Sequence, residues 1–114
     1  MSVVTNVMLA VGILDEDVAF IVKDWSVPTC TPYDQKFTRL DEESGWGGSK
    51  YPEVVLFGGA FNHLRTDTLQ EFLAALPWKW PDEAQLFIQR QNADKWAVYE
   101  LEGGSWCRLV KERQ

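Results

Sequence analysis

The amino-acid sequence predicts an α+β fold: a two-layer sandwich in which two helices pack on a mixed β-sheet that ends in a C-terminal three-stranded antiparallel meander. Apolar runs alternate with segments of helical periodicity through the first two thirds of the chain, and short alternating segments separated by turn residues fill the last third. With 114 residues, 46% of them hydrophobic, residues 1–114 are predicted to form a single domain around one buried core.

The first predicted elements are a strand over residues 3–14 and a helix over residues 15–25. The later part of the strand is apolar at every position, which is typical of a strand covered on both faces. Residues 15–17 are all acidic, as a helix N-terminus favours. Apolar residues then recur at helical spacing: Val18, Ile21, Val22 and Trp25.

Residues 26–52 are predicted to form a long irregular excursion with one short edge strand around residues 36–40. Three prolines and a glycine cluster interrupt this stretch, and it shows no clear periodicity. Its aromatic residues argue against simple disorder: Tyr33, Phe37, Trp46 and Tyr51.

The second half begins with a predicted interior strand over residues 53–57, stopped by Gly58 and Gly59. A helix follows from Thr66 or Asp67 and ends at Pro77. Its apolar stripe comprises Leu69, Phe72, Leu73 and Leu76.

The meander is predicted from strands over residues 84–91, 95–102 and 105–110, joined by a polar turn and by Gly103-Gly104. Before it, Trp78 and Trp80 lie in a stiff corner between two prolines. The favoured interpretation is that these indoles plug the end of the sandwich, and the alternative is that they are presented to a partner.

The charge of the chain favours a basic partner over nucleic acid. The net charge is −6, with nine acidic and four basic residues in 1–60 against eight and seven in 61–114. Such a field repels phosphate backbones and speeds encounter with a basic protein, although the acids could equally serve solubility alone. Because no apolar stretch is long enough to cross a bilayer and no basic leader precedes one, we expect a cytoplasmic protein.

Residues suited to catalysis or metal binding are sparse. Two cysteines, Cys30 and Cys107, and one histidine predict neither a metal site nor a cofactor. His63 is the one candidate general base, and with Gly58, Gly59 and Asn62 it forms an alternative predicted pocket where a strand feeds a helix. The competing interpretation is a turn histidine and two glycines that serve close packing.

The leading hypothesis is a small acidic non-enzymatic module that binds another, basic protein, in the physical manner of inhibitor or immunity proteins. Large aromatic side chains dominate binding hot spots, and Trp46 stands between glycines that do not shelter it. The predicted partner-binding residues are Tyr33, Asp41, Glu42, Glu43, Trp46 and Tyr51. Two alternatives stay open: a small-molecule or catalytic pocket near His63, and a subunit of a homo-oligomeric assembly.

Overall fold

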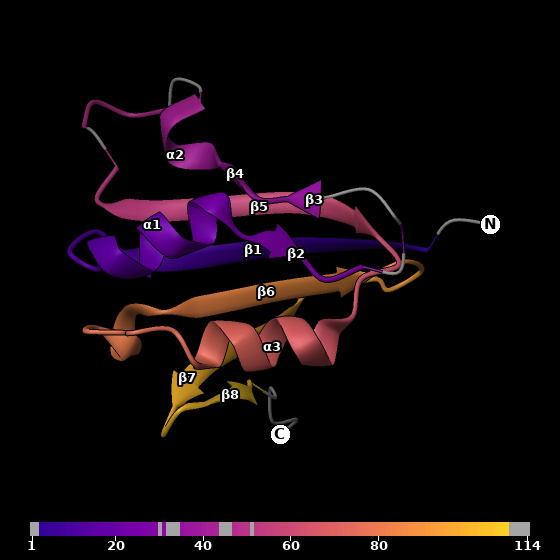
Figure 1. The fold of residues 1–114 in the computed structure, drawn as a ribbon. Helices are drawn as coiled ribbons and strands as arrows, with labels where there is room; N and C mark the ends of the chain where they lie inside the picture. Colours follow the sequence, from indigo (N-terminus) through magenta and orange to yellow (C-terminus); the bar gives the residue numbers. More distant parts are fainter. Residues whose placement is uncertain (1–2, 30, 32–34, 44–46, 51, 110–114) are drawn as a thin grey trace, which may run out of the picture.

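The computed structural model describes residues 3–29, 31, 35–43, 47–50 and 52–109, with the backbone alone for 42 and 43 (Figure 1). The predicted α+β fold is confirmed: helices pack on a six-stranded sheet, and a second sheet has two strands. The elements are β1 (Val4–Gly12), α1 (Glu16–Asp24), β2 (Ser26–Val27), β3 (Gln35–Lys36), β4 (Thr38–Arg39), α2 (Leu40–Glu43), β5 (Val54–Asn62), α3 (Thr66–Ala74), the 3₁₀ turn η1 (Pro81–Glu83), β6 (Gln85–Arg90), β7 (Ala97–Glu102) and β8 (Ser105–Arg108).

The large sheet has the strand order β4-β5-β1-β6-β7-β8, and each neighbouring pair is antiparallel. The prediction of a mixed sheet was therefore wrong. β1 and β4 run in the same direction, as do β5 and β6, but an antiparallel strand separates the members of each pair. This is the split β-α-β-β-α-β arrangement, with the hairpin β7–β8 added beyond β6. Apolar periodicity identifies strands, but it does not reveal which strand a crossover skips.

The core lies between one face of the sheet and the two longer helices, which lie on the same side of the sheet (Figure 1). Alternate residues of β1 face the helices, because successive side chains of a strand point to opposite faces. Trp25, just after α1, stacks on Phe72 of α3 with ring centroids 3.8 Å apart, which joins the two helices. The buried core residues include Val7, Leu9, Val11, Val18, Val22, Phe57, Phe61, Leu69, Leu73, Leu86 and Ile88.

Among the predicted strand boundaries that were wrong, two lie beside the candidate sites. β1 ends at Gly12, and Ile13 and Leu14 are exposed beyond it. β5 continues through the glycine pair, because both glycines are needed for packing within the sheet: a Cβ on Gly58 would lie 2.8 Å from Leu40 Cδ1, and one on Gly59 would lie 2.6 Å from the Phe61 ring.

The meander follows the prediction, but the excursion contains more secondary structure than the one predicted edge strand, because β2, β3 and α2 lie in it as well as β4. β4 is an edge strand inside the predicted range, and Phe37 is buried against the rings of Phe57 and Phe61. β6, β7 and β8 form the predicted antiparallel meander, with Gly103 and Gly104 at positive φ in its second turn.

Candidate functional site

Asp41 is the one predicted partner-binding residue whose side chain the structure describes. Tyr33, Trp46 and Tyr51 lie outside the described residues, and Glu42 and Glu43 belong to α2 with undescribed side chains. Of the predicted surface, the described part of the chain therefore gives the position of the Asp41 side chain alone.

The Asp41 carboxylate is held inside the fold. Its side chain is 7% exposed, forms an ion pair with Arg39 at 3.0 Å, and accepts a hydrogen bond from the backbone N–H of Leu56 at 3.0 Å. Burial by itself raises the pKa of Asp41, but the hydrogen bonds from Arg39 and Leu56 and the charge of Arg39 outweigh burial and hold the pKa below its ordinary value. β4 ends at Arg39, so it offers no backbone acceptor to the N–H of Leu56 in β5. The Asp41 carboxylate accepts that hydrogen bond instead.

The residues of the alternative pocket follow one another along β5 and do not converge. Gly58 is paired with Met8 on one side and Thr38 on the other, so its backbone belongs to the sheet. The backbone N–H of Asn62 donates a hydrogen bond to the side-chain oxygen of Gln35 at 2.9 Å. His63 has φ 52° and donates its backbone N–H to the carbonyl of Val3 at 2.9 Å. These positions favour a turn histidine and packing glycines over a pocket.

The two indoles of the proline-bounded corner have different environments. Trp78 packs against the core, donates its Nε1–H to the Leu73 carbonyl at 2.7 Å and meets Trp106 edge to face at 6.2 Å. Trp80 is 47% exposed. The predicted plug is thus correct for Trp78 and wrong for Trp80, which the same corner presents to solvent.

Asp15 fixes the backbone that carries Trp80. Its side chain is fully buried, and its two carboxylate oxygens accept the backbone N–H groups of Lys79, at 3.1 and 3.2 Å, and of Trp80, at 2.9 Å. It occupies the N-cap position of α1 but makes no side-chain capping bond there. The sequence pattern indicated only a helix start, because nothing local signals a contact across 64 positions.

Around this anchor the chain exposes four large apolar residues, of which the sequence indicated only Trp80, as the alternative interpretation of the corner. They lie in the turn after β1, on α1 and in the corner before β6, at the sheet end where Gly12 pairs with Val54. We call them the apolar end: Ile13 (47% exposed), Leu14 (65%), Phe20 (71%) and Trp80 (47%). Large apolar side chains gathered on a surface mark protein contact sites.

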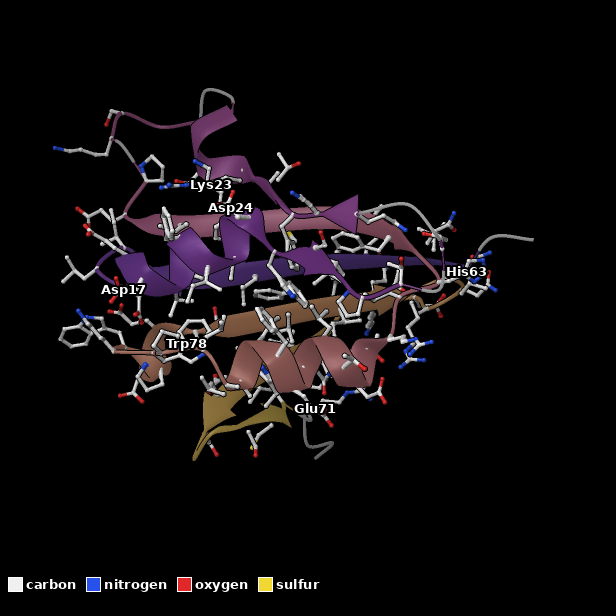
Figure 2. All side chains as sticks on the ribbon, in the orientation of Figure 1. Asp17, Lys23, Asp24, His63, Glu71 and Trp78 are labelled. Carbon is white, nitrogen blue, oxygen red and sulfur yellow. The ribbon has the colours of Figure 1, made fainter. Side chains whose placement is uncertain are left out.

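Acidic residues surround the apolar end. Glu16 and Asp17 begin α1, and Asp82 and Glu83 lie in η1, all four exposed. Lys79 is 3.8 Å from Asp17, with both side chains about two-thirds exposed. Figure 2 shows Asp17 at the opposite end of the molecule from His63.

A cleft of about 400 Å³ adjoins the apolar end. Ile13, Ala19 and Phe20 line it together with Val55 and Phe57 of β5. Its charged lining residues are of both signs, Glu16 with Lys23 and Arg39. The apolar end therefore combines protruding side chains with a recess that can accept an apolar group of a partner.

Among the described residues, no group of three or more His, Cys, Asp or Glu side chains is placed to hold a metal ion. Within the same part of the chain, no helix has the length and apolarity needed to cross a membrane. Comparisons with protein-family models, with curated proteins and with solved structures gave no match to this chain.

Proposed function

We propose that the chain is a small acidic, non-enzymatic protein-binding module, and that its apolar end captures a basic protein. The observation that carries this proposal is the exposure of Ile13, Leu14, Phe20 and Trp80 around the buried Asp15 carboxylate. A side chain on a backbone that is fixed before binding loses less conformational entropy on association, which is what an interface anchor requires.

Charge supports a basic partner. The net charge is −6, and exposed carboxylates stand on both sides of the apolar end, on α1 and on η1. Such charges steer a positively charged partner and raise its association rate, while the apolar anchors set its dissociation rate. The function class is inhibitor-like or immunity-like, and the proposed compartment is the cytoplasm.

The residues predicted from the sequence belong to the same proposal. Tyr33, Trp46 and Tyr51, with Glu42 and Glu43, are proposed as further contacts of the basic partner. Asp41 is proposed to act indirectly, by bonding Arg39 and β5 and so fixing the start of α2.

The test is affinity capture from an extract of the source cell on immobilised wild-type protein, Trp80→Ala and Trp96→Ala. Trp96 is a matched control, because it is also exposed and lies in the turn between β6 and β7. We expect the wild type and Trp96→Ala to retain a protein of positive net charge that elutes as salt is raised, and Trp80→Ala to lose it.

Three results would overturn the proposal. One is equal retention of that protein by Trp80→Ala. Another is a captured partner with net negative charge. The third is light scattering that shows a concentration-dependent dimer that Trp80→Ala abolishes, which would assign the apolar end to a homo-oligomer instead.

A further inference from the structure

A groove runs along α3, from Asp67 to the end of the helix, between it and the hairpin β7–β8, which passes beneath that helix in Figure 1. It consists of two clefts of about 440 and 520 Å³. Both clefts are lined by Ala74 and Gly104, so they adjoin each other. Gly103 and Gly104 place no side chain at the turn, which leaves the groove open on that side.

The described residues that line the groove include four carboxylates and no basic side chain. Asp67 and Glu71 line the first cleft, and Asp82 and Glu102 line the second. The groove therefore attracts cations, and it shares no lining residue with the cleft lined by Lys23 and Arg39.

The end of α3 adds to this negative potential. Helix carbonyls give the C-terminus a partial negative charge, which basic residues in the last turn commonly neutralise. The last turn of α3 contains no basic residue, and Ala74 and Ala75 line the groove at that point. The described residues that line the groove thus supply no cation at the position where one is most favourable.

Two indoles give the groove a surface suited to a planar cation. Trp106 lines the first cleft and Trp78 the second, and the two rings meet edge to face at 87°. Figure 2 shows Trp78 at the end of α3 and Glu71 on that helix. Guanidinium groups stack on indole faces and bond carboxylates through paired N–H donors, which an ammonium group cannot do in the same plane.

The wall of the first cleft also holds an unsatisfied donor. Trp106 Nε1 is buried and has no hydrogen-bond partner among the described residues. Buried polar atoms are normally satisfied, and the group that this N–H lacks is an acceptor such as a main-chain carbonyl.

We propose that this groove binds an arginine-bearing extended segment of the partner, with one guanidinium in each cleft. The inference rests on the proposed function, because it supplies the chemistry by which a basic protein is recognised. It adds a second contact region beside the apolar end, since Asp82 of η1 lines the second cleft and is one of the acidic residues around the apolar end.

The test uses the isotope-labelled whole protein and a pentapeptide amide, Gly-Arg-Gly-Arg-Gly, against the same peptide with citrulline in place of arginine. Citrulline keeps the shape of arginine without its charge. We expect the arginine peptide to bind at least about tenfold more tightly and to weaken with salt. The indole N–H signals of Trp78 and Trp106 should shift, and those of Trp80 and Trp96 should not.

Matched charge variants separate the groove from the general field of an acidic protein. The double variant Glu71→Gln with Glu102→Gln should weaken the arginine peptide about fivefold or more. Asp24→Asn with Asp94→Asn changes the net charge equally, at exposed positions outside the groove, and should leave binding nearly unchanged. Equal effects of the two double variants would overturn the proposal.

Ala75→Arg gives a result that misfolding cannot imitate. The new guanidinium lies at the C-terminus of α3, where it stabilises the helix and fills the groove. We expect a melting temperature equal to or above that of the wild type, together with about tenfold weaker binding of the arginine peptide. Unchanged peptide affinity in this variant, or equal binding of the citrulline peptide, contradicts the inference.

The two proposals can fail separately. If the peptide shifts Trp78 and Trp106 but Trp80→Ala still captures the cellular partner, the apolar end is refuted and the groove stands. If capture depends on Trp80 and the peptide leaves both groove indoles unmoved, the groove alone is refuted.

Discussion

The two ends of the central sheet use their side chains in opposite ways. At the end where Val4 pairs with Asn62, polar side chains satisfy the chain's own backbone: Gln91 Oε1 accepts from the Val4 N–H at 2.8 Å, and Gln35 bonds Asn62. At the other end the polar anchor, Asp15, is buried, and large apolar groups face outward. A buried carboxylate beside exposed apolar side chains reverses the usual arrangement of a soluble domain, in which charged groups face water and apolar groups face the core.

Apolar side chains are exposed at both ends of the sheet, and the two ends differ in how far these side chains are exposed and in how the backbone beside them is held. Val3, Val4 and Trp96 are also partly exposed near the His63 end. Val3 is as exposed as Ile13 and Trp80, and only Leu14 and Phe20 exceed it. Among the described residues, however, no buried carboxylate holds the backbone beside Val3, Val4 or Trp96. Exposure combined with a fixed backbone is what distinguishes the apolar end as a contact surface.

The largest expected effect compares the two indoles of the corner. Trp78→Ala should lower the free energy of unfolding by about 3 kcal/mol, because it removes core packing and the hydrogen bond to Leu73. Trp80→Ala should lower it by less than about 1 kcal/mol, because that side chain is half exposed. Urea unfolding of both variants measures the difference. Similar losses would show that Trp80 belongs to the core.

Removing the anchor should have the next largest effect. Asp15→Ala leaves the N–H groups of Lys79 and Trp80 without their acceptor, and the free energy of unfolding should fall by about 2 to 3 kcal/mol. Asp17→Ala is the matched control: its exposed pair with Lys79 contributes at most about 0.5 kcal/mol. The same urea titration tests both, and an unaltered stability of Asp15→Ala would mean that the corner is not held by this carboxylate.

The His63 end should respond more weakly. Gln35→Ala removes one side-chain amide that both accepts from and donates to the backbone of Asn62. Water can replace part of this bonding at a partly buried site, so we expect a loss of about 1 to 1.5 kcal/mol. Amide hydrogen exchange should also accelerate at Asn62. Unchanged exchange there would indicate that the end of β5 does not depend on Gln35.

The smallest effect is pH-dependent and concerns Asp41. Because its pKa in the folded state is below the ordinary value, the stability it contributes is present above the unfolded pKa and is lost as pH falls through the folded pKa. Asp41→Asn should cost on the order of 1 kcal/mol at neutral pH, and this difference from the wild type should shrink as pH falls through the ordinary pKa of 3.8 and below it. A difference that is independent of pH would show that the carboxylate charge does not matter.

The sequence predicted the fold well where periodicity is strong. The strands of the meander and the buried positions Val18, Val22, Leu69 and Leu73 follow from apolar spacing, which senses burial directly. The apolar run through Ile13 and Leu14 misled the prediction, because an exposed turn of apolar residues has the same composition as a covered strand.

The candidate site depends on contacts that no local pattern records. Trp78 and Trp80 share the same flanking prolines, yet only the position of the helix end and of Trp106 decides which one is covered. The role of Asp15 depends on the 79–80 backbone, which lies beside it in a sheet where β1 pairs with β6. Long-range pairing, rather than propensity, thus places the site.

Site-specific photo-crosslinking tests the central claim most directly. A benzophenone amino acid replaces Phe20 in one variant and Asp94, an exposed turn residue near the His63 end, in the other. Both variants are irradiated in extract of the source cell. We predict a covalent adduct with a basic protein from position 20 and none from position 94. An adduct with that protein from position 94 alone would contradict the assignment of the apolar end as the binding surface.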